Sequence, residues 1–178
     1  MADAYALIRE SHVKVCTVVG FPLGNSSSAT KVKEAKVAIE NGAEEIDMVI
    51  NQAAIKSERW EDVLSDISQV KVATEKYVLK VILETCNLTD DEIAKACQIA
   101  EKAGADFVKT STGFAAAGAT PEAVKIMKAN ISSKVKIKAS GGIRDLASVE
   151  EYIKLGVSRI GASSGVAIME GKKSDSSY

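Results

Sequence analysis

The sequence is poor in the residues that most often bind metals or stack on bases. Its 178 residues include one histidine, His12, three cysteines and only 4% aromatic residues. The cysteines are odd in number and lack metal-ligand spacing, so with His12 they do not make a zinc site. We therefore predict no metal, and we interpret Cys16, Cys86 and Cys97 as small core residues in a reducing compartment. The few aromatic residues argue against a surface that stacks on nucleic-acid bases.

Strong charge of one sign and long apolar runs are missing as well. The net charge is −1 and no basic tract is present, which argues against nucleic acid or an anionic membrane as a partner. No apolar run approaches the roughly 20 residues of a membrane span, and the opening MADAYALIRES does not resemble a signal peptide. We expect a cytoplasmic protein with no membrane partner.

What the sequence does contain is a regular alternation of two patterns. Short apolar runs that predict strands lie at 13–20, 44–50, 77–85, 106–112, 135–140 and 158–163. Segments with a helical period lie between them, at 28–42, 57–76, 89–104, 120–130 and 144–156. Strands that alternate with helices predict a parallel sheet with right-handed crossovers.

This alternation fits a (β/α)-barrel or an open doubly wound sheet. No G-x-G-x-x-G follows the first strand, which disfavours a dinucleotide-binding sheet. A complete barrel has eight units and this sequence contains six, so we predict a TM (β/α)8-type barrel that lacks about its first two βα units. We assign 1–171 to a single partial barrel domain and 172–178 to a flexible polar tail. The first and last strands would then have unpaired edges, which favour association.

Several predicted strands carry charged residues in their interiors. Because side chains alternate along a strand, Asp47 and Lys109 lie on faces opposite to apolar neighbours, and so does Lys138. Lys80 and Glu84 share a face of their strand in the same way. A solvated edge explains one such strand but not four, so we expect the charged faces to line the barrel interior.

The two lysines and the aspartate suggest a specific chemistry. An amine attacks a carbonyl only when it is neutral, and a second ammonium nearby lowers its pKa. Lys109 and Lys138 fall near the C-terminal ends of successive strands, where barrel enzymes build their active sites. Asp47 would relay protons, or would hold one lysine charged while the other is neutral. This combination suits imine formation followed by proton transfer at the adjacent carbon.

Glycine-rich segments follow the last two strands. Gly141 and Gly142 come after one strand, and Ser163 and Ser164 come after the next, before a short predicted helix. Glycines let backbone N–H groups approach an anion, and barrels often bind phosphate with the loops after their last two strands. We predict a phosphate site here, and hence a phosphorylated small-molecule substrate.

The residues resemble a known family over about 13–171. The segments EIDMVIN, FVKTSTGF, KVKIKASGGIR and RIGASSG are similar to motifs of the deoxyribose-phosphate aldolases, which are class I aldolases on a TIM barrel. The segments TVVGFPLG and KVILET resemble strands of that family. The implied reaction is the reversible cleavage of 2-deoxy-D-ribose 5-phosphate into D-glyceraldehyde 3-phosphate and acetaldehyde, without cofactor or metal.

The resemblance also implies residue roles. Lys109 matches the Schiff-base lysine, and Asp47 and Lys138 match the pair that transfers the proton. Gly141, Gly142, Ser163 and Ser164 match the phosphate loops. Tyr178 is a further candidate for proton transfer, because some family members end in a tyrosine.

Two other functions stay open. The family's first strand carries an Asp and a Thr that help to hold substrate, and this sequence has no counterpart of it, so one alternative is an inactive partial barrel. A phosphate-binding barrel isomerase or epimerase would use the same glycine loops without a neutral lysine. In each case we expect a homo-oligomer, with a dimer favoured.

Overall fold

The computed structural model of this chain describes residues 1–172. Within that range the strands form one parallel sheet, in which every strand lies next to its neighbours in sequence. They are β1 (Cys16–Val19), β2 (Glu45–Val49), β3 (Val78–Ile82), β4 (Phe107–Lys109), β5 (Lys136–Ser140) and β6 (Arg159–Gly161). The six strands lie where the sequence predicts them, and each is shorter than its predicted range.

Helices connect the strands. They are α1 (Ala2–Ile8), α2 (Ser28–Glu40), α3 (Gln52–Lys56), α4 (Trp60–Ala73), α5 (Asp90–Lys102), α6 (Pro121–Ala129), α7 (Leu146–Lys154) and α8 (Gly165–Met169), with a 3₁₀ turn η1 (Thr85–Asn87). The helix α3 and the turn η1 were not predicted, because both are too short to show a helical period. No helix in the described part of the chain has the length and apolarity to cross a membrane.

Local sequence sets where two of these helices begin. Thr89 precedes α5 and forms a capping box with Glu92, in which each side chain bonds to the other residue's backbone N–H. Thr120 caps α6, and Pro121 occupies the first turn, where its missing N–H costs no intrahelical bond. Both helices therefore start at the residues that the sequence indicates.

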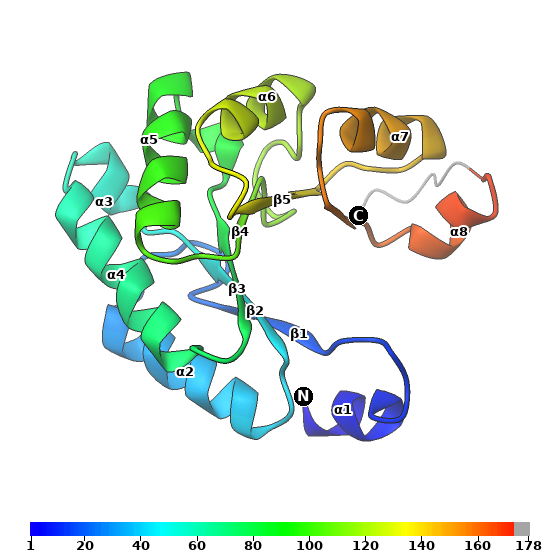
Figure 1. The fold of residues 1–178 in the computed structure, drawn as a ribbon, viewed down its shortest axis with the longest axis horizontal. Coiled ribbons are helices and arrows are strands. Elements are labelled where there is room, and N and C mark those ends of the chain that lie inside the picture. The colour runs from blue at the N-terminus through cyan, green and yellow to red at the C-terminus, as the bar shows by residue number, and fades with distance from the viewer. Residues whose placement is uncertain (173–178) are drawn as a thin grey trace.

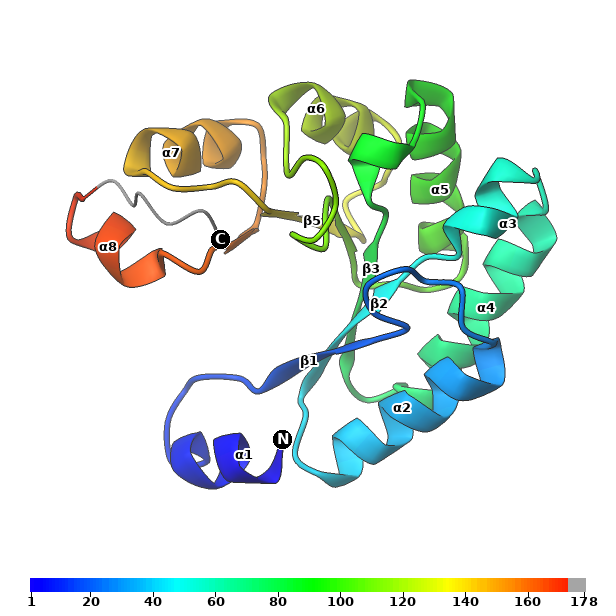
Figure 2. The same cartoon turned by 180° about the vertical axis from the view of Figure 1, so that it is seen from behind.

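The sheet curls around one open side (Figures 1 and 2). Helices α2, α4, α5 and α6 cover its outer, convex side, while α1 and α8 lie at the two ends of the curl. Among the described residues β1 and β6 each pair with one neighbouring strand, so the sheet does not close. The fold is thus a six-unit β/α half-barrel, as the sequence predicts.

The two faces of the sheet differ in chemistry. Ile46 and Met48 of β2 point outward, as do Leu79 and Val81 of β3, and all four join the buried core under the helices. The alternate residues point inward and are largely charged, as the next subsection describes. Alternation of side chains along each strand therefore separates an apolar core from a polar interior.

One charged pair is buried on the helix side. Lys31 of α2 is completely buried, and its Nζ lies 2.5 Å from Asp66 Oδ2 of α4. The same ammonium donates to the carbonyl of Val49 at 2.9 Å. This pair joins α2 and α4 behind the sheet.

Candidate active site

The candidate site begins with Lys109, at the C-terminal end of β4. In the register of the sheet Lys109 lies beside Lys138 of β5 and beside Ile82 of β3. Both lysine side chains point to the inner side of the curl, and Lys109 is only 7% exposed. Residues 27 and 29 positions apart in sequence thus become neighbours, because parallel strands align their C-terminal ends.

Asp47 of β2 is the centre of the charge cluster. Its Oδ2 accepts hydrogen bonds from Lys109 Nζ and from Lys138 Nζ, both at 2.8 Å. Its Oδ1 accepts from Lys80 Nζ at 2.9 Å. A single buried carboxylate therefore faces three ammonium groups.

These contacts shift pKa values in opposite directions. Burial alone favours the neutral form of Asp47, but the three ammonium groups outweigh it and hold the pKa of Asp47 well below its ordinary value. Burial lowers the pKa of Lys109, and the positive charge of Lys138 lowers it further, against the attraction of Asp47. The site thus combines an ionised carboxylate with a lysine that loses its proton more readily than a free one.

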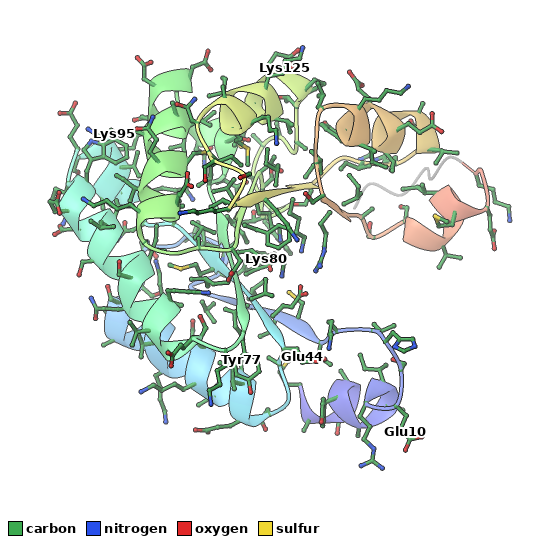
Figure 3. The ribbon with its side chains drawn as sticks, in the orientation of Figure 1. Glu10, Glu44, Tyr77, Lys80, Lys95 and Lys125 are labelled. Atoms are coloured by element: carbon green, nitrogen blue, oxygen red, sulfur yellow. The ribbon has the colours of Figure 1, made fainter. Side chains whose placement is uncertain are left out.

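Lys80 is a residue whose role the sequence did not reveal. Parity places it on the inner face, and Figure 3 shows it on the side of the sheet away from the helices α4 and α5. Its Nζ also bonds to Glu45 Oε2 at 2.6 Å, and that oxygen lies 2.5 Å from Arg159 Nη1 of β6. Burial lowers the pKa of Lys80, but Asp47 and Glu45 more than offset this and raise it. The available signal was the register, which puts Lys80 beside Asp47.

A pocket opens directly above the two lysines. Its volume is about 230 Å³, and Lys109 and Lys138 line it. Its remaining walls come from loops at the C-terminal ends of the strands: Thr112, Gly113, Phe114, Ser140, Gly141, Gly142, Ile143, Gly161, Ala162 and Ser163. The predicted phosphate residues Gly141, Gly142 and Ser163 therefore border the same space as the predicted catalytic lysines.

Ser164 lies just outside this pocket lining. It precedes α8, and its side chain makes no capping hydrogen bond to that helix. Tyr178 lies outside the described residues. Among the described residues, no group of three or more His, Cys, Asp or Glu side chains is arranged to hold a metal ion.

Close backbone approaches shape the pocket floor. Gly141 and Gly142 have φ angles of 85° and 75°, which residues with a Cβ rarely adopt. A Cβ on Gly118 would lie 2.1 Å from the carbonyl oxygen of Gly141, and one on Gly161 would lie 3.2 Å from Lys138 Cε. Gly118 is thus required where the loop after β4 packs against the backbone of Gly141. Gly161 leaves room for the Lys138 side chain.

The interpretation of the cysteines is wrong for two of the three. Cys97 is buried, and burial raises its pKa to about 12. Cys16 and Cys86 are exposed. Cys16 points inward from β1, with Sγ 3.2 Å from Asp47 Oδ1, but no further strand in the described chain covers β1.

Comparisons with known proteins identify the family of this chain. Residues 2–171 match the model of the DeoC/LacD family aldolases. The chain belongs to this aldolase family. It is 53% identical to the deoxyribose-phosphate aldolase of Carboxydothermus hydrogenoformans, over 98% of this chain and 78% of that protein. It is 54% identical to deoxyribose-phosphate aldolase 1 of Staphylococcus aureus (strain MRSA252), over 96% of this chain and 78% of that protein.

A solved structure extends the likeness to three dimensions. The deoxyribose phosphate aldolase of Aeropyrum pernix, a tetramer, superposes with a TM-score of 0.85 at 35% identity, covering 95% of this chain and 72% of that one. The aldolase resemblance and the barrel-type fold predicted from sequence are thus confirmed. A buried lysine beside a carboxylate and a second lysine has the chemistry that imine formation requires.

Proposed function

We propose that this chain reversibly cleaves 2-deoxy-D-ribose 5-phosphate into D-glyceraldehyde 3-phosphate and acetaldehyde, through an imine on Lys109. The observation that carries the proposal is the shared carboxylate oxygen: Lys109 and Lys138 both lie 2.8 Å from Asp47 Oδ2, beneath a pocket bordered by glycine turns. The names of the relatives at 53% and 54% identity support the same substrate.

The first steps form the imine. The neutral amine of Lys109 attacks the aldehyde carbon C1 of the open-chain sugar, and the resulting carbinolamine loses water to give an iminium ion. The lowered pKa of Lys109 increases the fraction of amine that can attack at neutral pH. Lys138 Nζ lies beside that amine, because both bond to Asp47 Oδ2.

The carbon–carbon bond then breaks. A base takes the proton from the C3 hydroxyl, the C2–C3 bond breaks, and its electron pair moves into the iminium to leave an enamine and glyceraldehyde 3-phosphate. Protonation of the enamine carbon regenerates the iminium, and water releases acetaldehyde and free Lys109. Asp47 and Lys138 supply the proton acceptor and donor, because they share a hydrogen bond next to the reacting nitrogen.

The glycine turns are proposed to hold the phosphate. Gly141 and Gly142 expose backbone at the end of β5, and Ser163 lies across the pocket at the end of β6. Ser164 follows at the start of α8 and completes the loop. An anion there would place the sugar chain along the pocket toward Lys109, a geometry that raises the local concentration of the aldehyde.

The direct test is turnover. The purified chain is incubated with deoxyribose 5-phosphate, and acetaldehyde and glyceraldehyde 3-phosphate are measured as paired products. We expect equal amounts of both from the native chain and neither from K109R, which keeps the positive charge but offers no nucleophile. Products from K109R at the native rate would overturn the proposal.

One observation favours an alternative, an inactive partial barrel. The inner residues of β1 face an open side, and Val18 is 40% exposed there. Water that reaches Lys109 and Lys138 would weaken the electrostatic interactions between the two lysines and with Asp47. A folded sample with no turnover, and no imine with acetaldehyde, would favour this alternative.

We also propose that the chain self-associates, with a dimer as the first state, in the cytoplasm. In the part of the chain that the structure describes, β1 and β6 each have one unpaired edge, and this supports the proposal because exposed edges favour pairing between chains. The tetramer of the Aeropyrum pernix relative points the same way. Sedimentation velocity over a range of concentrations tests it, and a monomer at every concentration would contradict it.

A further inference from the structure

A buried glutamate with an unusual backbone lies beside the pocket. Glu84 has φ 57° and ψ 62°, in the left-handed region that residues with a Cβ rarely adopt, and it is 2% exposed. The N–H groups on either side of it, from Leu83 and Thr85, bond to the carbonyls of Lys109 and Thr110, which are consecutive. Glu84 is therefore an extra residue between paired positions, as in a β-bulge, and such bulges redirect side chains near active sites.

The redirected carboxylate holds the loop after β4. Glu84 Oε1 accepts from the backbone N–H of Thr112 at 3.1 Å, and Oε2 accepts from the hydroxyl of Thr112. That hydroxyl in turn accepts from the N–H of Phe114 at 3.0 Å. One carboxylate thus fixes Thr112 directly and Phe114 through it.

The segment held in this way is a wall of the lysine pocket. Thr112, Gly113 and Phe114 all line that pocket, and Glu84 does not. Glu84 and Thr112 instead line an adjoining pocket of about 370 Å³, so the segment 112–114 separates the two spaces. The Phe114 ring also meets Phe21 edge-on at 5.3 Å, which ties the segment to the loop after β1.

We propose that Glu84 is a positioning residue that fixes the wall 112–114 against the substrate. This inference rests on the proposed function for the identity of the substrate. A five-carbon sugar phosphate that spans from Lys109 to the glycine turns extends along this wall, whereas acetaldehyde, with two carbons, does not span the pocket. Strained backbone at a site is held in place by its surroundings and persists where geometry serves function.

The test compares E84G, T112V and T112S. Glycine accepts the backbone of position 84 without strain and removes the whole Glu84 side chain, its carboxylate included, and valine removes the Thr112 hydroxyl with little change in shape. We expect E84G and T112V each to raise KM for deoxyribose 5-phosphate by about tenfold. T112S keeps the hydroxyl and is expected to stay near the native value. The matched control is E58G, because Glu58 has φ 55° but is exposed and lines neither pocket.

A double-mutant cycle separates positioning from simple destabilisation. If Glu84 acts through Thr112, E84G/T112V will be little worse than T112V alone, because the two changes remove one connected network. The proposal would be overturned if the increase in KM in E84G/T112V equalled the product of the increases in the two single variants. The proposal would also be overturned if E84G lost borohydride-trapped acetaldehyde on Lys109 to the same extent as it lost turnover of deoxyribose 5-phosphate, because acetaldehyde does not span the pocket.

Hydrogen exchange gives a readout that does not depend on turnover. In E84G the amides of Thr112 and Phe114 are expected to exchange faster than in the native chain, while those of E58G are unchanged. If both amides exchange in E84G at the rates of the native chain, Glu84 does not hold the segment 112–114. If the native chain forms no imine but the Thr112 and Phe114 amides still exchange faster in E84G, the proposed function is wrong, whereas the role of Glu84 in holding the segment 112–114 is supported.

Discussion

Two buried lysines with aspartate partners have different surroundings in this molecule. Lys31 is fully buried between α2 and α4, with one carboxylate, Asp66, and one carbonyl to itself. Lys109 is 7% exposed, shares its carboxylate oxygen with a second lysine, and opens onto a pocket. Burial and pairing are common to both, so they do not identify a reactive lysine. We propose that a shared carboxylate, a like charge and an open path for a ligand identify it.

The largest expected difference comes from removing each amine. K109M should abolish both turnover and trapped acetaldehyde while the chain stays folded. K31M should instead cost about 3–5 kcal/mol of unfolding free energy, because it leaves Asp66 buried without its cation. Its folded fraction should still form the imine. Denaturant unfolding and intact mass after borohydride reduction measure the two properties.

A second variant sharpens this contrast. K31M/D66L replaces the structural pair by apolar side chains and is expected to recover much of the stability lost in K31M. Recovery of activity by any apolar replacement of Lys109 and Asp47 would contradict the distinction between the two pairs.

The next effect concerns the shared carboxylate. D47N should lower turnover by about 10²–10⁴-fold, the range for loss of an acid–base group. The attraction of Asp47 raises the pKa of Lys109, so its removal should lower that pKa further. Imine trapping in D47N should therefore persist, with its midpoint at lower pH. A midpoint that moves to higher pH would contradict the assigned electrostatics.

Lys80 should have a smaller effect. K80M removes one of the three ammonium groups around Asp47 but leaves the bonds to Lys109 and Lys138. We expect kcat to fall by about tenfold with KM little changed, because the carboxylate loses orientation while the substrate pocket is intact. K80R, which keeps the charge, is the control. A change confined to KM would argue against a positioning role for Lys80.

The smallest expected effect is a shift of a pH profile. The positive charge of Lys138 lowers the pKa of Lys109, so K138M should raise it. The pH midpoint for trapped imine should therefore move to higher pH. The same profile measured for K134M, at an exposed lysine before β5, should match the native one.

Much of this site could be predicted because side-chain parity and strand register are simple. Asp47, Lys109 and Lys138 occupy inward positions near aligned strand ends, so their meeting follows from a parallel sheet. The family resemblance added the roles that spacing alone left open.

Other features depend on geometry that the sequence does not display. The clamp by Glu84 needs a bulge after β3, and no local pattern marks it. The exposure of Cys16 depends on which strands cover β1, which a residue's own type cannot indicate. The role of Lys80 needed the register between β2 and β3 rather than its hydrophobic pattern.

The most direct test of the account is reductive trapping of acetaldehyde at a series of pH values, followed by peptide mapping. The account predicts one adduct, on Lys109, with a midpoint below the value of about 10.4 for a free lysine. An adduct at Lys138 or Lys80 in its place, or a Lys109 midpoint at or above that value, would contradict it.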